Sequence, residues 1–543
     1  MAHVEYSVEG PVAIATIDNP PVNALSHVVR AGLSDALARA LGDAHVKAVV
    51  LIGAGKLFSG GADITEFGKP PKSPSLRDVI RAIESSAKPV VAAIHGTAFG
   101  GGFEIALACH ARIALAGAKL GLPEVKLGLI PGAGGTQRLP RLIGAEEALK
   151  LIVEGSPVPA DKAKALGIVD ELAADDLRAA AIAFAQRVAS EQPTPRRTSA
   201  LPVPPTKPGF FDEFARGLAK KHRGFRAPFR AVEAVRLATQ LPIEEGLARE
   251  RDIFMELMAS PESRAQRHAF FAEREVAKIP GLPKETQSRE VRKAGVVGAG
   301  TMGGGIAMCF ANARIPVTMV ESTQEALDRG LATIRKNYAT SVARGSLSQD
   351  EMDRRMGRIQ PSLRYEDLAD ADVIIEAVFE ELGVKKEVFG RLDGLAKDGA
   401  VLATNTSYLD VNAIAAATKR PGDVLGMHFF SPANVMKLLE NVRGAKTAPD
   451  VLATAQALGK TLGKVPVVVG VCDGFVGNRM LARRGREAYF LLEEGALPWQ
   501  IDKVLYDFGF PMGPFAMGDL AGLDVGWRNR KAKLDQLTER ERA

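Results

Sequence analysis

The chain has 543 residues, of which 46% are hydrophobic and 25% are charged, a composition that excludes a fibrous or disordered protein. At about 150 residues per domain, this length predicts three or four domains. The formal net charge of +6 suits small polyanionic ligands such as nucleotides and coenzyme A, whereas nucleic acid would require a longer basic tract than the cluster 220–230.

Cysteine usage and the two ends of the chain bear on the compartment. Cys109, Cys309 and Cys472 lack the spacing of metal ligands, so we expect a reducing compartment and no metal site. The first residues form no basic leader, no apolar run reaches about 18 residues, and the chain ends in Arg540–Ala543 rather than in a Ser-Lys-Leu address. We therefore predict a soluble cytoplasmic protein without a membrane span.

Residues 1–190 show the pattern of an α/β domain. Apolar strands are predicted at 12–17 and 47–52, and a Gly-rich turn follows the second. Prolines at positions 193, 195, 202, 204, 205 and 208 then interrupt regular structure and indicate a linker.

A helical pattern runs from residue 243 to residue 277. Leu247, Phe254 and Met258 share one face, and Ser260 followed by Pro261 supplies the cap and first turn of a new helix. We predict that residues 191–290 form a Pro-rich linker and helices that pack on the first domain.

Residues 291–471 change to the order strand, Gly-rich turn, helix, strand. The first strand covers 294–297, and further apolar strands are predicted at 372–378, 400–403 and 424–427. Such runs are typical of parallel strands covered on both faces, so we predict a Rossmann-type, doubly wound α/β sheet. Residues 472–543 are predicted to form a partial all-helical domain.

Two carboxyl groups follow a glycine triplet in the first domain. Gly100–Gly102 let the backbone approach a ligand closely, and the predicted helix after them directs its first N–H groups at that ligand. Glu104 lies in the first turn of this helix, where a carboxylate can also serve only to complement the helix dipole. With Glu124, the set offers the acid, the base and the N–H donors that water addition to an unsaturated thioester requires.

The segments Phe58–Asp63 and Leu122–Glu124 complete a pattern that resembles the crotonase, or enoyl-CoA hydratase/isomerase, family over about the first 190 residues. The resemblance implies that Ala62 and Gly101 donate their N–H groups to the thioester oxygen. It also implies that Glu104 and Glu124 hold the attacking water between them. The isomerases of this family need only the position of Glu124, so hydration is expected, with isomerisation as an additional activity.

Other candidates in this domain are expected to be structural. Gly132–Gly135 lacks the Lys-Ser or Lys-Thr of a phosphate-binding loop, so we interpret it as a tight turn. His95 and His110 lack an evident charged relay partner and are expected to be core or surface histidines.

A dinucleotide fingerprint opens the second α/β domain. Gly298 allows the tight turn, Gly300 the close approach of a pyrophosphate and Gly303 the packing of the helix. Glu321 ends the next strand, where its oxygens bind ribose hydroxyls and its charge repels a 2′-phosphate. The cofactor is therefore predicted to be NAD rather than NADP.

A histidine and a glutamate are the candidate base and its partner for oxidising an alcohol. His428 taken alone is more often a satisfied core residue, but His428–Pro432 with Met436–Glu440 resembles the 3-hydroxyacyl-CoA dehydrogenase family. Further matching motifs are Asn405-Thr-Ser407 and Asp473–Asn478. The resemblance implies that His428 is the base, Glu440 its orienting partner, and Ser407 and Asn478 polar groups that face the substrate, whereas Ser431 replaces an asparagine of many single-function members.

The order of the two halves resembles the multifunctional fatty acid β-oxidation enzymes, including the peroxisomal type 1 form and its bacterial relatives. We expect hydration of trans-2-enoyl-CoA followed by NAD-dependent oxidation to 3-ketoacyl-CoA, by a monomer or by a complex with a thiolase. The helical region of the family continues well beyond 518–523, whereas this chain ends at Ala543. Two alternatives follow: a full hydratase with a weak dehydrogenase, or a hydratase with an idle module that binds NAD and acyl-CoA.

Overall fold

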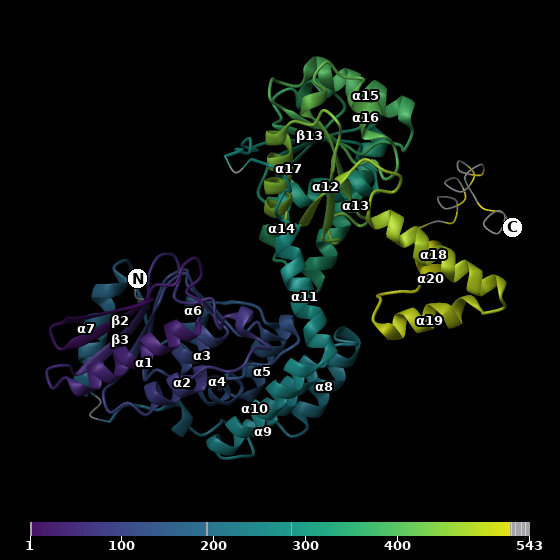
Figure 1. The fold of residues 1–543 in the computed structure, drawn as a ribbon. Helices are drawn as coiled ribbons and strands as arrows, with labels where there is room; N and C mark the ends of the chain where they lie inside the picture. Colours follow the sequence, from purple (N-terminus) through teal and green to yellow (C-terminus); the bar gives the residue numbers. More distant parts are fainter. Residues whose placement is uncertain are drawn as a thin grey trace. The chain divides into compact units, whose positions relative to one another are not determined.

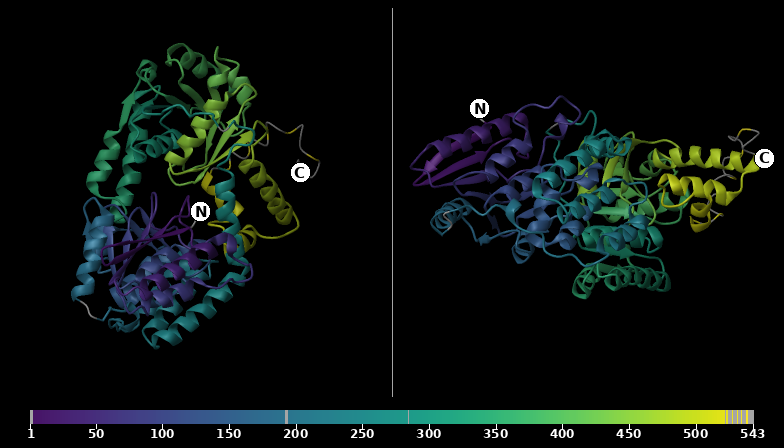
Figure 2. Two further views of the ribbon diagram at one scale, coloured as in Figure 1. Left: turned by 60° about the vertical axis from the view of Figure 1, so that its left-hand side comes forward. Right: turned by 90° about the horizontal axis from the view of Figure 1, so that it is seen from below.

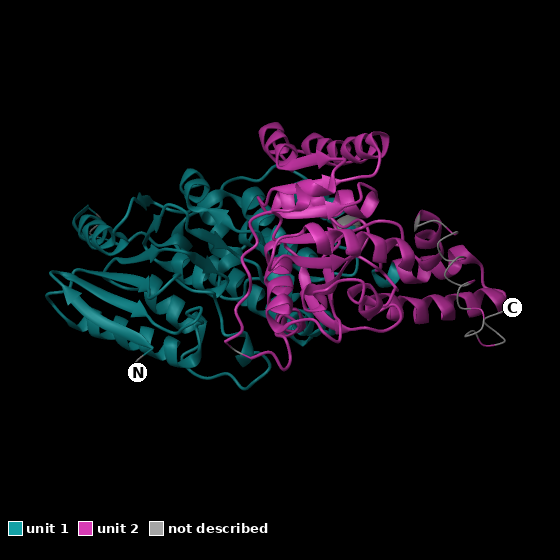
Figure 3. Cartoon of the chain, turned by 90° about the horizontal axis from the view of Figure 1, so that it is seen from above, with its two compact units in different colours: residues 1–270, 507–509 teal, residues 271–506, 510–543 magenta. Residues whose placement is uncertain are grey.

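The computed structural model describes residues 3–191, 194–283, 285–521, 523, 527, 531, 534 and 538. It contains two compact units, which comprise residues 1–270 with 507–509, and residues 271–506 with 510–543 (Figure 3). Pro193 and the chain end at Arg540–Ala543, which entered the expectations above, lie outside the described residues. Each unit is described by itself.

Unit 1 is built on a six-stranded sheet in the order β1-β2-β3-β4-β6-β9. Its first two strands pair antiparallel and form the purple end of the chain in Figure 2, and every later pair is parallel. Apolar residues fill the inner strands, so both faces are buried there, whereas the edge strand at residues 4–9 is largely exposed. The strands are β1 (Val4–Glu9), β2 (Val12–Ile17), β3 (Ala48–Gly53), β4 (Val90–Ile94), β6 (Ala111–Leu115) and β9 (Glu171–Ala173).

Helices cover both faces of this sheet, which confirms the predicted α/β domain. Helix α7 (Leu177–Glu191) packs on one face, and α1 (His27–Gly42), α2 (Leu76–Glu84) and α3 (Gly101–Ala108) contribute to the core on the other (Figure 1). A small second sheet joins β5 (Thr97–Phe99), β7 (Lys119–Gly121) and β8 (Val158–Pro159), and α4 (Gly135–Ile143), α5 (Ala145–Glu154) and α6 (Ala160–Ala165) lie near it in the chain.

The helices after the linker belong to unit 1 as far as Phe270. Ile253 and Leu257 lie in the same core as Ala231 and Val235. The predicted break at Ser260 is present, since its hydroxyl accepts a hydrogen bond from the Ser263 N–H at 3.2 Å. The helices are α8 (Phe210–Lys221), α9 (Ala227–Ala238), α10 (Ile243–Ala259) and α11 (Pro261–Glu275).

Unit 2 contains an eight-stranded sheet in the order β12-β11-β10-β13-β14-β15-β16-β17. The strand order reverses between β10 and β13, which makes the topological switch point where doubly wound sheets bind ligands. Helices α12 (Thr301–Asn312), α13 (Gln324–Ala343) and α17 (Pro449–Thr461) cover one face, and α15 (Leu382–Leu395) and α16 (Val411–Ala415) cover the other. The strands are β10 (Ala294–Val297), β11 (Val317–Val320), β12 (Ile359–Ser362), β13 (Val373–Glu376), β14 (Val401–Thr404), β15 (Val424–Phe429), β16 (Leu438–Arg443) and β17 (Val465–Gly470).

One strand pair departs from the predicted all-parallel sheet. Strands β15 and β16 run antiparallel, with His428 opposite Glu440. Residues 430–437, which join them, are too few for the crossover that a parallel pair requires. The helices of this unit are α12 (Thr301–Asn312), α13 (Gln324–Ala343), α14 (Gln349–Gly357), α15 (Leu382–Leu395), α16 (Val411–Ala415) and α17 (Pro449–Thr461).

The segment after Cys472 is helical, as predicted. It forms α18 (Gly477–Glu493), α19 (Pro498–Phe508) and α20 (Pro514–Ala521). In the described part of the chain, no helix combines the length and the apolar character needed to cross a bilayer.

Candidate active sites

Two backbone amides lie together beside the glycine triplet of unit 1. Gly100 has φ +51°, and its N–H donates to the Gly121 carbonyl at 2.9 Å, which sets the start of α3. A methyl group placed on Gly101 would lie 3.3 Å from the Ala62 nitrogen. Within residues 3–191, the amides of Ala62 and Gly101 donate no hydrogen bond, so both are available to an oxygen of a ligand.

Glu104 is held from the turn that precedes α4. Its side chain is 3% exposed, and its Oε1 accepts hydrogen bonds from the N–H groups of Ala133 and Gly135, both at 2.8 Å. Burial raises the pKa of this carboxyl above its ordinary value, although the two hydrogen bonds act in the opposite direction. The interpretation of Gly132–Gly135 as a purely structural turn is therefore incomplete, because this turn positions a site residue.

Glu124 begins a 3-10 helix and offers a different environment. Its Oε2 is buried and accepts no hydrogen bond within the described residues. Burial, and then the charge of Glu104, raise the pKa of Glu124 well above its ordinary value. The surroundings of the two carboxyls therefore differ, since two amides favour the charged form of Glu104 against the effect of burial, whereas burial and the charge of Glu104 favour the neutral form of Glu124.

The two histidines near the triplet are structural, as expected. His110 is buried, and its Nδ1 accepts a hydrogen bond from the Val90 N–H at 2.9 Å. Burial lowers the pKa of His110 to about 4. His95 makes a 3.1 Å contact with the Gly55 carbonyl through Nε2.

The predicted dinucleotide turn lies between β10 and α12. Gly298 has φ +105°, and a methyl group on Gly303 would lie 1.9 Å from the Gly298 carbonyl oxygen, so neither position accepts a side chain. A methyl group on Gly300 would meet no atom within 4 Å. The open space at Gly300 and the amino end of α12 fit the pyrophosphate of a dinucleotide.

Glu321 follows β11 at the same edge of the sheet. Its oxygens accept hydrogen bonds from the Ala299 N–H at 2.9 Å and from the Ser322 N–H at 2.7 Å. Burial acts to raise the pKa of Glu321, but these hydrogen bonds hold it below its ordinary value. Glu321 is thus a carboxylate beside the turn, as ribose recognition requires.

His428 and Glu440 face each other across β15 and β16. His428 Nδ1 lies 2.8 Å from Glu440 Oε2, and both side chains are buried. The other oxygen of Glu440 accepts the N–H groups of Val476 at 3.0 Å and Gly477 at 2.8 Å. Although burial acts to raise the pKa of Glu440, the hydrogen bond from His428 and the two amides lower it. An ionised Glu440 keeps a proton on Nδ1 and leaves Nε2 as an acceptor.

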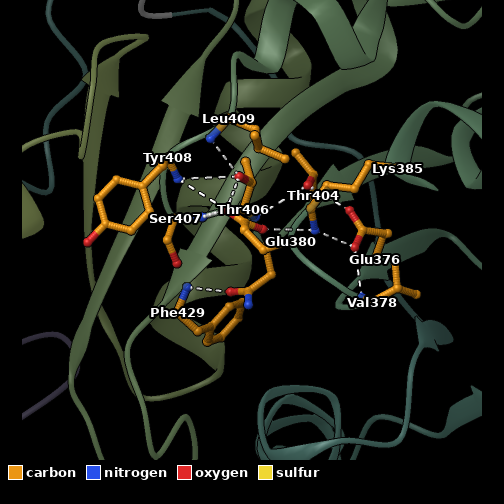
Figure 4. Close-up of polar contacts among 11 residues, drawn as sticks. Glu376, Val378, Glu380, Lys385, Thr404, Thr406, Ser407, Tyr408, Leu409 and Phe429 are labelled. Carbon is orange, nitrogen blue, oxygen red and sulfur yellow. Dashed lines mark hydrogen bonds and ion pairs between the residues drawn. The ribbon is translucent and has the colours of Figure 1, made fainter. Parts of the chain in front are cut away.

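A polar network that reaches from the buried residues Glu376 and Lys385 to the exposed Glu380 positions the loop that carries Ser407 (Figure 4). Glu380 accepts hydrogen bonds from the Thr406 hydroxyl at 2.6 Å and from the Ser407 N–H at 2.8 Å. Lys385, which is 1% exposed, joins Glu380 at 3.2 Å to Glu376 at 2.7 Å. These three ionic residues were not predicted from the sequence. The signal for them is a glutamate that interrupts a predicted apolar strand, nine residues before a lysine.

The remaining predicted residues lie near the His428–Glu440 pair in the fold. The side-chain oxygen of Asn405 accepts the Phe429 N–H at 2.8 Å, which ties the Ser407 loop to the residue after His428. Asn478 follows Gly477, whose amide binds Glu440, in the first turn of α18. Ser431 is exposed beyond the end of β15.

Known protein families match the two halves of the chain separately, and some known proteins match nearly the whole chain. The family described as enoyl-CoA hydratase/isomerase matches residues 7–200. The families described as 3-hydroxyacyl-CoA dehydrogenase, NAD binding domain, and 3-hydroxyacyl-CoA dehydrogenase, C-terminal domain, match residues 293–472 and 474–543. These matches confirm both resemblances.

Relatives of similar organisation match nearly the whole chain. A peroxisomal bifunctional enzyme of Danio rerio is 48% identical over 538 residues, which cover 98% of this chain and 74% of that protein. The peroxisomal bifunctional enzyme of Homo sapiens is 45% identical, over 97% of this chain and 74% of that protein. A solved structure of 3-hydroxybutyryl-CoA dehydrogenase from Escherichia coli is 40% identical, covers 44% of this chain and 51% of that chain, and has a TM-score of 0.42.

Proposed function

We propose that this chain, a member of the family of bifunctional fatty acid β-oxidation enzymes, catalyses two consecutive reactions, one in each of its two units. It is an enoyl-CoA hydratase and an NAD-dependent 3-hydroxyacyl-CoA dehydrogenase. Hydration of trans-2-enoyl-CoA gives 3-hydroxyacyl-CoA, which is then the substrate of the oxidation.

For hydration, the amides of Ala62 and Gly101 hold the thioester oxygen and stabilise the charge that develops on it. Glu104 accepts a proton from water as the water oxygen bonds to C3, and Glu124 donates its proton to C2. This division follows from their surroundings, because the turn amides favour the charged form of Glu104 while burial favours the neutral form of Glu124.

For oxidation, bound NAD supplies the acceptor for the hydride that leaves C3. The turn at Gly298–Gly303 and the carboxylate of Glu321 would hold the dinucleotide. His428 takes the proton of the 3-hydroxyl group on Nε2, and Glu440 stabilises the resulting imidazolium through Nδ1. Ser407 and Asn478 bind polar groups of the substrate.

We further propose that Glu124 supports isomerisation of 3-enoyl-CoA to 2-enoyl-CoA, since moving a double bond requires one group that removes and returns a proton. We still predict the cytoplasm as the compartment. The alternative is a peroxisome or glyoxysome, since the relatives are named as peroxisomal or glyoxysomal proteins. A monomer and a complex with a thiolase also remain predictions.

The observation that carries the assignment of unit 1 is a pair of carboxyls with different environments: Glu104 is buried and bonded to two amides, and Glu124 is half-buried with an Oε2 that accepts no hydrogen bond in the described residues. Glu104→Gln and Glu124→Gln should each lower hydration of crotonyl-CoA by about 10²–10⁴-fold, because each removes a proton-transfer group. The measurement is the loss of ultraviolet absorbance of the conjugated thioester.

Two controls accompany these variants. Glu147→Gln removes an exposed carboxyl that pairs only with Lys150 in the described structure and should hydrate at the parent rate. Oxidation of 3-hydroxybutyryl-CoA by the two site variants should also stay at the parent rate. Hydration near the parent rate in either Glu104→Gln or Glu124→Gln would show that the acid and base assignment is wrong.

A further inference from the structure

One turn in unit 1 holds two carboxyl groups rather than one. The N–H groups of Ala133 and Gly135 donate to Glu104, as described above. The N–H groups of Gly134 and Thr136, which alternate with them, donate to Glu250 of α10 at 2.7 and 3.1 Å. The Thr136 hydroxyl donates to the same carboxyl at 2.5 Å. Four consecutive amides are therefore divided between a site residue and a glutamate from a distant helix.

The charges around this turn do not balance. Glu250 is 0% exposed and lies close enough to Glu104 and Glu124 for their charges to interact. Arg77 of α2 faces the buried carboxyls and interacts with both Glu250 and Glu104. The guanidinium of Arg138 from α4 also lies near the turn, where its charge lowers the pKa of Glu104 while it forms a 2.6 Å ion pair with Glu84.

Three buried carboxyls, Glu84, Glu104 and Glu250, therefore share two cations. Three such groups cannot all remain ionised at a small cost in free energy. Glu104 must be ionised to accept a proton from water, so the proton that relieves the repulsion has to lie elsewhere. Glu250 reaches no substrate-facing amide, and its two oxygens already contact the turn and Thr136, so it can carry that proton without blocking the site.

We propose that Glu250 is a positioning residue of the hydratase: it braces the turn that holds Glu104 and carries the proton of this buried carboxyl pair, so that Glu104 stays ionised. The inference rests on the roles proposed for Glu104 and Glu124 and extends them to a third residue. Burial, followed by the charge of Glu104, raises the pKa of Glu250 to about 8, although Thr136, Arg77 and Gly134 oppose the shift.

This arrangement gives hydration a specific dependence on pH. Above pH 8, Glu250 ionises and adds a negative charge beside a site where the transition state already develops one on the thioester oxygen. The hydration rate should therefore fall by about tenfold between pH 7 and pH 9, the equivalent of one unit of interaction between the two charges.

The test compares the ratio of the hydration rates at pH 9 and pH 7 in the parent, Glu250→Gln and Glu256→Gln. Glutamine cannot ionise, so the ratio should rise toward one in Glu250→Gln. Glu256→Gln alters an exposed carboxyl of the same helix, which pairs with Arg226 and Arg230, and should keep the parent ratio. A parent rate that does not fall, or an equal fall in Glu250→Gln, would overturn the proposal.

Two further measurements do not depend on that variant or on turnover. Thr136→Val removes a hydroxyl that favours the ionised form of Glu250, so the midpoint of the fall should move to higher pH; an unmoved or lower midpoint would contradict the proposal. Infrared difference spectra of substrate-free enzyme between pH 7 and pH 9 should show loss of a protonated carboxyl band in the parent and not in Glu250→Gln. If the band still titrates in Glu250→Gln, the proton belongs to another group, whatever the outcome of the hydration assays.

Discussion

Replacing Glu440 by glutamine exchanges one carboxylate oxygen for an NH2 group and so tests whether the charge of Glu440 is needed by His428. Glutamine keeps the size of the side chain and can still accept the N–H groups of Val476 and Gly477 through its oxygen. Its NH2 group then faces Nδ1 of His428, which must become the acceptor. The proton of the neutral ring therefore moves to Nε2, where the base has to be free.

The size of the effect follows from the geometry of the pair. A hydrogen bond to a charged group contributes about 1.5–3 kcal/mol, and here the bond is 2.8 Å long and buried. Shifting the tautomer adds to this loss, so the transition state should be destabilised by about 3–4 kcal/mol. At 1.36 kcal/mol for each factor of ten, the turnover of Glu440→Gln should fall roughly 10²–10³-fold.

The assay is NADH formation from 3-hydroxybutyryl-CoA, followed by absorbance. Glu440→Asp, which keeps the charge, should retain more activity than Glu440→Gln. Calorimetric binding of NAD and hydration of crotonyl-CoA by the same samples should match the parent and so exclude misfolding. A turnover within threefold of the parent in Glu440→Gln would refute the argument that this carboxylate sets the tautomer of His428.

Three further predictions concern the cofactor, the fold of unit 2 and the stability of unit 1. Glu321→Ala should weaken NAD binding about 10–100-fold, the equivalent of a lost hydrogen bond to a charged group, and narrow the difference between NAD and NADP in calorimetry; equal binding of both by the parent would contradict this. Lys385→Met should lower the free energy of unfolding of unit 2 by about 3–5 kcal/mol, because it leaves Glu376 buried without its cation. Adding Glu376→Gln to this variant should recover part of the loss. An unchanged thermal midpoint of unit 2 in Lys385→Met would disprove the prediction. The pKa of His110 is about 4 in the folded protein, so the unfolded chain binds more protons below pH 6.5. The free energy of unfolding of unit 1 should therefore fall by about 3 kcal/mol between pH 6.5 and pH 4. Urea unfolding should show a smaller fall over this pH range in His110→Gln.

Local features of the sequence were enough to predict both α/β folds and the dinucleotide turn. The strands are continuous apolar runs. The turn from Gly298 to Gly303 is made by residues close together in the chain, and a side chain at Gly303 would collide with the backbone of Gly298 in the same turn. Family resemblance, rather than spacing, identified Glu104, Glu124, His428 and Glu440. Their pairing depends on strands and turns far apart in the chain, which no local pattern specifies.

Only the tertiary structure could decide which charged residues are buried. In the sequence, Glu250 stands between Arg249 and Arg251 and has the appearance of a solvated helix face, yet it is bonded to an amide 116 residues away. The same holds for Lys385, which a helix places against Glu376 under the Ser407 loop. A charge becomes informative about function when packing removes it from water, because its pKa and its partners are then set by neighbours from other parts of the chain.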